Sequence, residues 1–399
     1  MRKKIAWLVP FPIEGSGGIS NIFYNMNYLS SKGFDCHAYV ENPNGLKSSK
    51  EMKKIVESYF GPIIGKIHVG FEVDEKFDLI FATAWYTAKI VRDINQNCKK
   101  AYFVQDFEPY FNPMGEGYLL AENSYMYGLE PITIGKWLTH KLNKEYNNHA
   151  NFFEFCADTN IYYPDNSIKK EKAVCFVYQP DKPRRSSAMG IEALGIVKHH
   201  LPDVEIYLFG SELRHHVWFP HKVLPLLSYK ELSKLYNKCQ VGFCISSSNP
   251  SRIPFEMMAT GLPVVDIYRE NNLYDLPSEG VSLAHQTPES LAEAIIELLT
   301  NEEKRNKMSN FSIEYMRTKS LEIGYQQMYE NVLNILNDNT KAQVHVDKMY
   351  KEKPVVASHY LNQFILSTRQ SISSLENIPA YKRNIIYRLL RKIKRKVLK

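Results

Sequence analysis

The chain has 399 residues, of which 44% are hydrophobic and 23% are charged, a composition that excludes a largely disordered protein. One hydrophobic core rarely suffices at this length, so we expect two domains. The net charge of +7 is concentrated in residues 381–399, which contain nine Lys or Arg and no acidic residue, and the rest of the chain is therefore nearly neutral.

The first apolar run, Ile5 to Val9, is far shorter than the roughly 20 residues that a membrane helix needs. No small-residue cleavage site of a signal peptide accompanies it. The six cysteines show no C-x-x-C spacing, which fits reduced thiols better than a disulfide framework or a zinc site. The twelve histidines show no H-E-x-x-H or other ligand spacing. We therefore expect a cytoplasmic protein that binds no metal.

Two series of alternating apolar strands and helices predict the architecture. The first has strands at 3–11, 34–40, 77–83 and 99–107, and helices at 21–33 and 84–96. The second repeats the alternation from a strand at 171–179 to a helix at 288–300. Strands separated by helices pair in parallel, so we predict two doubly wound α/β domains, 1–165 and 170–318. Because ligands bind beyond the carboxyl ends of such strands, two facing sheets would hold a ligand between them.

A glycine-rich turn follows the first strand and contains Gly17 and Gly18. Glycines let the backbone approach a phosphate, and the start of a helix offers free N–H groups, so we expect these two residues to contact a phosphate or an acceptor. The alternative is a tight turn without a ligand. A dinucleotide fingerprint is poorly supported, because its third glycine would fall at Ser20.

Two features of the second domain are suited to a nucleotide sugar. Arg184 and Arg185 end a proline-interrupted loop after the strand at 171–179, where two guanidinium groups could hold a diphosphate. Glu256 stands near the start of the helix at 253–261, where a carboxylate can accept hydrogen bonds from ribose hydroxyls. The alternatives are a solvated arginine pair and an acidic residue that complements the helix dipole.

Together these features resemble the retaining family four of the GT-B glycosyltransferases, which have two Rossmann-like domains. In that family the second domain carries an arginine and a lysine five residues apart, then two glutamates eight apart before A-x-G-x-P-V-V. Here Gln179, Arg184, Ser248 and Glu256 occupy those positions. The segment VQDFEPYFNPMGEGYLLAENSY at 104–125, together with SNPSRIPFEMM, is similar to the WsaF group of rhamnosyltransferases, which also lacks the first glutamate. The resemblance covers about residues 1–337.

The resemblance implies a GT-B fold with a cleft between the domains, a helix at 319–337 that crosses back to the first domain, and a helical extension at 338–399. It implies retaining transfer of rhamnose from dTDP-rhamnose, without a metal, to a hydroxyl of a bacterial surface glycan or a lipid-linked precursor. The donor-binding residues it indicates are Arg184, Arg185, Gly210, Ser248, Pro254, Phe255 and Glu256.

Asp106 and Glu256 are the catalytic residues that the resemblance implies, and Tyr110 and Tyr118 are the acceptor-binding ones. Asp106 stands near the place where the family often has a histidine, and it would orient the acceptor hydroxyl or the transferred sugar. Alternatively, Asp106 only accepts hydrogen bonds from nearby backbone. Asp106 and Glu108 also imitate a metal-binding Asp-x-Asp pair, an interpretation that we do not favour.

Two other functional classes remain open. Gln179 and Ser248 fit a catalytically silent protein that binds a nucleotide sugar or acts as a scaffold for an active transferase. A sugar-nucleotide epimerase of the same two-domain form is the other enzyme alternative, and it would need no acceptor.

The basic C-terminal segment, 381–399, has the pattern of an amphipathic helix. Its apolar residues recur at spacings of three and four, opposite arginines and lysines. Such a helix suits the surface of an anionic membrane, so we expect a peripheral protein on the inner face of the plasma membrane, and no nucleic-acid partner. The alternatives are a solvated tail, a helix packed on the body, and nucleic-acid binding. The stripe comprises Ile385, Ile386, Leu389, Leu390, Ile393 and Val397.

Overall fold

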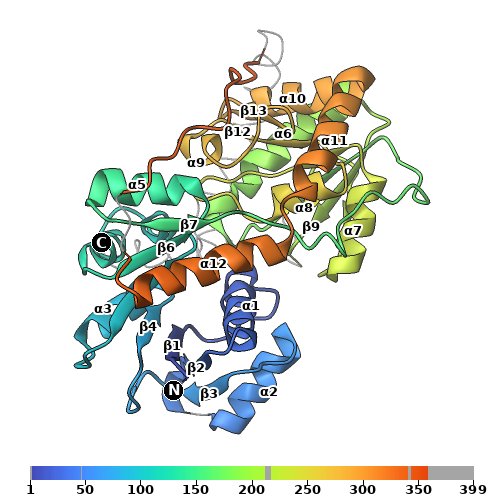
Figure 1. Ribbon diagram of the computed structural model, residues 1–399. Coiled ribbons are helices and arrows are strands. Elements are labelled where there is room, and N and C mark those ends of the chain that lie inside the picture. The colour runs from blue at the N-terminus through green and yellow to red at the C-terminus, as the bar shows by residue number, and fades with distance from the viewer. Residues whose placement is uncertain (1, 46, 212–216, 340–342, 358–399) are drawn as a thin grey trace, which may run out of the picture.

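The computed structural model describes residues 2–45, 47–211, 217–339 and 343–357. Two parallel β-sheets, each flanked by helices, form two domains that lie one above the other in Figure 1. The predicted fold class, two doubly wound α/β domains, is confirmed. All six cysteines lie within the described residues, and none forms a disulfide.

The first domain contains a sheet of seven strands in the order β3-β2-β1-β4-β5-β6-β7, in which every neighbouring pair is parallel. Its centre is apolar, and the Trp7 ring stacks on Phe81 at 4.2 Å between centroids. The strands are β1 Lys4–Val9, β2 Asp35–Val40, β3 Lys66–Val69, β4 Leu79–Ala82, β5 Lys99–Val104, β6 Glu130–Ile134 and β7 Asn151–Phe153. The helices are α1 Gly17–Ser31, α2 Ser49–Phe60, α3 Trp85–Asp93, α4 Glu116–Asn123 and α5 Lys136–Tyr146.

The second domain contains six parallel strands in the order β10-β9-β8-β11-β12-β13. Its strands are β8 Ala173–Val177, β9 Glu205–Phe209, β10 Lys222–Val223, β11 Val241–Phe243, β12 Val264–Ile267 and β13 Val281–Ala284. Its helices are α6 Ser187–His200, α7 Tyr229–Lys238, α8 Ile253–Ala259, α9 Glu270–Leu273, α10 Pro288–Thr300 and α11 Glu302–Arg317. In both sheets the order reverses next to the first strand, which is the arrangement that leaves a ligand site at the carboxyl edge.

The last helix in the described part of the chain, α12 (Leu321–Leu336), runs back along the first domain, as Figure 1 shows. The side-chain amide of Asn331 donates to the carbonyl of Phe152 at 3.0 Å. The Tyr28 hydroxyl on α1 lies 2.9 Å from the side-chain oxygen of Gln326. These contacts tie the end of the second domain to the first.

The described part of the C-terminal extension differs from the expected helical form. Residues 343–357 contain no helix. Gln343 and Val344 contact the end of α5, and Val355 forms a parallel bridge with Ala284 at the end of β13. The Tyr350 hydroxyl accepts the N–H of Leu283 at 3.0 Å. The edge strand β13 has backbone groups free for pairing, and pairing with them favours an extended chain over a helix.

The basic segment 381–399 lies outside the described residues. Within the described part of the chain, no helix is both long and apolar enough to span a bilayer.

A buried carboxylate of the second domain caps a helix of the first. Asp275 accepts the N–H groups of Lys136 at 2.7 Å and of Trp137 at 3.1 Å, at the start of α5. Burial raises the pKa of Asp275 to about 6, while both N–H groups favour the ionised form. Gly135 precedes α5 with φ of +84°, and a Cβ there would lie 3.0 Å from the Asp275 carboxylate, so the close approach requires glycine.

We expect Asp275→Ala to lower the free energy of unfolding by about 2 kcal/mol, because it leaves two buried N–H groups without an acceptor. Urea unfolding followed by fluorescence measures the change. Asp347→Ala is the control, since the Asp347 side chain is 92% exposed. Equal midpoints for the two variants would contradict the role of Asp275 in joining the domains.

Candidate functional site

The predicted site residues gather where the carboxyl ends of strands from both sheets meet. Strand β5 leads directly into Gln105 and Asp106, and β1 leads into the glycine-rich turn before α1. From the second domain, the loop 244–252 follows β11 and the loop 178–186 follows β8. These loops contact one another across the domain boundary.

Asp106 joins the domains through both of its carboxylate oxygens. Oδ1 accepts the backbone N–H of Asn249 at 2.9 Å, and Oδ2 accepts the hydroxyl of Ser248 at 3.0 Å. Oδ1 also accepts the N–H of Phe107 at 2.9 Å, the local backbone contact of the alternative interpretation. Burial raises the pKa of Asp106, and the positive charge of Arg184 opposes this shift.

The contact between Ser248 and Asp106 explains why a serine is compatible with this position. A glutamate at 248 would bring a second carboxylate toward Asp106 in a poorly hydrated place, where two like charges repel strongly. The serine hydroxyl instead donates a hydrogen bond to the carboxylate. Residues 106 and 248 therefore form a matched pair.

Asn249 and Arg252 also join the domains, and the sequence analysis did not single them out. The Asn249 side-chain amide donates to the carbonyls of Gln105 at 3.0 Å and Ile134 at 3.1 Å. Arg252 Nη2 donates to Asn21 Oδ1 at 2.6 Å. Both residues lie in the SNPSRIP segment of the resemblance, which is the signal that could have identified them.

Arg184 and Arg185 lie beside this loop. The guanidinium of Arg184 lies 4.4 Å from the centre of the Phe111 ring, and its carbonyl accepts the Ser247 hydroxyl at 2.7 Å. Arg185 Nη1 donates to Ser251 Oγ at 3.4 Å, while its buried Nε has no hydrogen-bond partner among the described residues. Neither guanidinium forms a salt bridge with any residue that the structure describes. An anionic ligand would supply the missing acceptor.

Gln179 brings no charge to the position where the family has an arginine. Its backbone N–H donates to the Ser187 hydroxyl at 3.0 Å, and its side-chain amide donates to the Gly210 carbonyl at 3.2 Å. Gly210 has φ of +103°, and a Cβ there would lie 3.3 Å from Gln179 Cγ. Glycine at 210 therefore permits both the backbone conformation and the approach of Gln179.

Glu256 lies half-buried in the first turn of α8. Burial raises its pKa to about 7, while the charge of Arg252 and the hydroxyl of Tyr162 favour the ionised form. The neighbouring Phe255 is 2% exposed and stacks on Phe155 at 4.9 Å between centroids, and Pro254 is also buried. The Phe255 ring therefore packs in the core, and a donor contact of this residue stays a prediction.

The remaining predicted residues surround the same region to different degrees. Gly17 and Gly18 are exposed at the start of α1, and a Cβ on Gly18 would lie 3.6 Å from the Gln105 side chain. Tyr110 is half-buried, packs edge-on against Phe107 at 4.7 Å and lies 5.7 Å from the guanidinium of Arg269. Tyr118 is half-buried on α4. Only part of each tyrosine is therefore accessible to an acceptor.

Asp106 and Glu108 do not form a carboxylate pair. Glu108 is buried and accepts the Tyr102 hydroxyl at 2.8 Å and the Trp85 N–H at 3.0 Å. Its carboxylate is thus fully engaged inside the first domain, whereas Asp106 faces the second. The arrangement does not fit a metal bound by these two residues.

An open cavity of about 690 Å³ lies away from this site, beside the C-terminal extension. Lys136, Tyr315 and Lys348 are among its lining residues, and it includes none of the predicted site residues. We therefore place the candidate site at the facing strand ends and not in this cavity.

The chain matches two protein-family models. Residues 51–136 match the family model of the WsaF N-terminal domain, and residues 172–296 match that of the WsaF C-terminal domain. Together the matches cover more than half of the chain. The O-antigen biosynthesis protein RfbC of Myxococcus xanthus is 28% identical over 269 residues, and spore coat protein SA of Bacillus subtilis is 30% identical over 140 residues.

These alignments cover 64% and 34% of this chain, but only 21% of RfbC and 35% of spore coat protein SA. Among solved structures, sucrose-phosphate synthase from Thermosynechococcus elongatus superposes with a TM-score of 0.66 and 14% identity, covering 84% of this chain and all of that one. HepE of Anabaena, solved in complex with UDP and glucose, superposes with a TM-score of 0.65 and 14% identity, and again covers 84% of this chain and all of that one. At this identity the structural likeness shows the fold alone.

We expect Ser248→Glu to lower the thermal unfolding midpoint, because it sets a second carboxylate against Asp106. Ser248→Ala removes one hydrogen bond and should cost only about 1 kcal/mol. Asp106→Asn combined with Ser248→Glu should be less destabilised than the two single changes predict, because one of the two charges is removed. Coupling energies between contacting residues are about 0.5–3 kcal/mol, so additive effects would show that the two side chains do not meet.

Proposed function

Because this chain belongs to the WsaF-like glycosyltransferases of the GT-B fold, we propose that it transfers a sugar from a nucleoside diphosphate donor to a glycan hydroxyl. The donor we propose is dTDP-rhamnose, and the acceptor is a bacterial surface glycan or its lipid-linked precursor. RfbC is named as an O-antigen biosynthesis protein, and HepE has been solved in complex with UDP-glucose, which supports both the pathway and the donor class.

The proposal rests on one observation: arginines and carboxylates lie close together where the strand ends of the two domains face each other. Arg184 and Arg185 lie beside the loop whose Ser248 and Asn249 bind Asp106. A departing nucleoside diphosphate develops negative charge, and positioned guanidinium groups stabilise it in a poorly hydrated site. In this proposal the two arginines perform that role and transfer requires no metal.

We assign the other residues by where they lie. Glu256, in the first turn of α8, accepts hydrogen bonds from the ribose hydroxyls of the donor. Asp106, at the domain boundary, orients the acceptor hydroxyl or the transferred sugar. The anomeric configuration is retained by attack from the face of the departing diphosphate, without a protein nucleophile.

The serines of the loop after β11 support a 6-deoxyhexose as the transferred sugar. Ser248 has a short side chain where the wider family has a glutamate. Rhamnose has one hydroxyl fewer than an ordinary hexose, so a short polar side chain suits it. The identity of the transferred sugar is the most specific part of the proposal, and it requires that the protein bind dTDP.

We expect dTDP to raise the thermal unfolding midpoint more than UDP, GDP or ADP does. A ligand at about a hundred times its dissociation constant stabilises the folded state by ~2.7 kcal/mol, which such a panel detects readily. Arg184→Ala and Glu256→Gln should each reduce the shift, and Asp347→Ala should leave it unchanged. Incubation with dTDP-rhamnose and candidate acceptors, followed by mass spectrometry, then identifies the product.

The outcomes separate the candidate functions. A selective response to UDP or GDP would keep glycosyl transfer but replace dTDP-rhamnose as donor. Nucleotide binding without turnover would favour the silent partner, for which the uncharged Gln179 is the supporting observation. Conversion of the donor sugar without an acceptor would indicate an epimerase.

We propose in addition that residues 381–399 hold the protein at an anionic membrane, where a lipid-linked acceptor would be met. The support is the sequence pattern of one apolar stripe opposite basic residues.

Removal of residues 381–399 should move the protein from anionic vesicles to the supernatant in a sedimentation assay. Leu389→Ser with Leu390→Ser keeps the charge but interrupts the apolar stripe, so it should weaken binding to vesicles most clearly at high salt, where electrostatic attraction is screened. Equal pelleting of the truncated and full-length chains would refute membrane attachment by this segment.

A further inference from the structure

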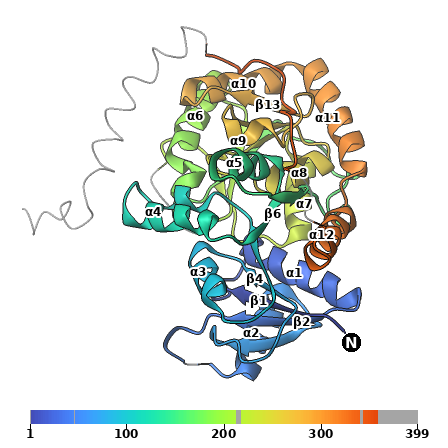
Figure 2. The same ribbon diagram turned by 60° about the vertical axis from the view of Figure 1, so that its left-hand side comes forward.

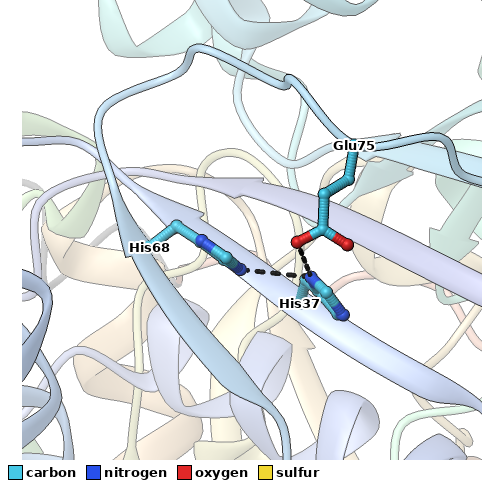
Figure 3. A group of neighbouring side chains, drawn as sticks. All are labelled: His37, His68 and Glu75. Atoms are coloured by element: carbon cyan, nitrogen blue, oxygen red, sulfur yellow. Dashed lines mark hydrogen bonds and ion pairs between the residues drawn. The ribbon is translucent and has the colours of Figure 1, made fainter.

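Three potential metal ligands meet at the edge of the first sheet. His37 lies on β2, His68 on the neighbouring strand β3, and Glu75 in the loop that follows β3 (Figure 3). The strand register pairs His37 with Lys66 and Tyr39 with His68. Because side chains alternate between the faces of a strand, both histidines lie on the same face of the sheet.

The ligand atoms are spaced as a single ion requires. His68 Nε2 lies 3.1 Å from His37 Nδ1, and Glu75 Oε1 lies 3.9 Å from the same Nδ1. All three atoms lie within 4.8 Å of one another. Two ligands of a tetrahedral zinc ion, each about 2.1 Å from the metal, are about 3.4 Å apart. Figure 3 shows both side chains directed at His37 from different sides.

Neighbouring charges orient the ligand atoms. Asp35 Oδ1 and Lys66 Nζ both lie 3.2 Å from His37 Nε2, and Lys66 Nζ also lies 3.5 Å from Asp35 Oδ2. In the tautomer whose Nε2–H donates to Asp35, the lone pair of Nδ1 is directed at the other two residues. Lys4 binds Glu75 Oε2 at 2.8 Å and leaves Oε1 facing His37. A carboxylate behind a ligating histidine is the usual arrangement of protein metal sites, since it sets the tautomer and the ring orientation.

Packing restrains both rings before any ion is bound. His37 is fully buried, and the Phe77 ring lies edge-on to it at 5.0 Å. The His68 ring stacks on Tyr39 at 4.5 Å with an interplanar angle of 11°. Restrained ligands lose little conformational freedom on binding, which favours affinity.

We propose that His37 Nδ1, His68 Nε2 and Glu75 Oε1 bind a zinc ion, with water as the fourth ligand. Two imidazoles and one carboxylate suit zinc better than magnesium or calcium, which prefer oxygen ligands. When the ion binds, the proton shared between the facing nitrogens moves to Nδ1 of His68. The ion fastens the loop after β3 to the edge strand β3 and its neighbour β2, and it thereby stabilises this edge of the sheet.

This zinc site is separate from the proposed transfer reaction. The candidate functional site is built on the loops after β1, β5, β8 and β11, whereas the zinc ligands come from β2, β3 and the loop after β3. The test of zinc binding therefore does not depend on which sugar donor the protein uses. It measures the metal content and the stability of the protein.

The test uses the untagged full-length chain, treated with a chelator and then titrated with zinc in a calorimeter. We expect one zinc ion per chain and a zinc-dependent rise of the unfolding midpoint. His68→Gln and Glu75→Gln should each weaken binding at least tenfold, and Asp35→Asn should weaken it about 10–100-fold through His37. His149→Gln, at an exposed histidine, should bind zinc as the unmodified chain does.

Circular dichroism confirms that each variant is folded before the titration. The half-buried His68 and Glu75 are chosen for substitution in place of the fully buried His37, whose loss would itself disturb the core. Zinc binding of equal strength in the chain with and without His68→Gln would overturn the proposal. So would the lack of any saturable zinc binding by the chelator-treated chain.

Discussion

The hydrogen bonds of the Asp106 carboxylate fix the position of the two domains relative to each other. A carboxylate that is partly removed from water needs partners for its oxygens, and here Ser248 and Asn249 of the other domain supply them. Asn249 in turn binds two carbonyls of the first domain. Since the same loop leads into α8, the position of Glu256 depends on this contact.

A second carboxylate, that of Asp275, also joins the two domains. Asp275 belongs to the second domain and accepts N–H groups of the first, whereas Asp106 belongs to the first and accepts donors of the second. Separation of the domains would deprive both carboxylates of their partners in the other domain and expose them to water. The two carboxylates would therefore accept hydrogen bonds from the other domain when the domains are together, and from water when they are apart. Such a difference can give a hinge two discrete states.

The sequence predicted much of the fold and less of the site, for identifiable reasons. Long apolar runs such as β1 and β8 were recognisable, but β7 has three residues and β10 has two, too few to show a period. Residues such as Asp106 and Ser248 were found through the resemblance, although their contact joins positions 142 residues apart. The pairing of Arg252 with Asn21 and the burial of Phe255 depend on how the domains pack, which no local pattern records.

The departure at Ser248 becomes intelligible when both domains are considered together. The wider retaining family often has a histidine near 106 and has a glutamate at 248, and this chain has Asp106 and Ser248 instead. One carboxylate is thus retained at the contact, but it comes from the first domain. In the proposed reaction this carboxylate faces the sugar only while Ser248 and Asn249 hold it, that is, while the domains are closed. Because of this substitution, the negative charge is positioned only when the two domains are in contact. The missing glutamate therefore does not by itself imply a loss of function.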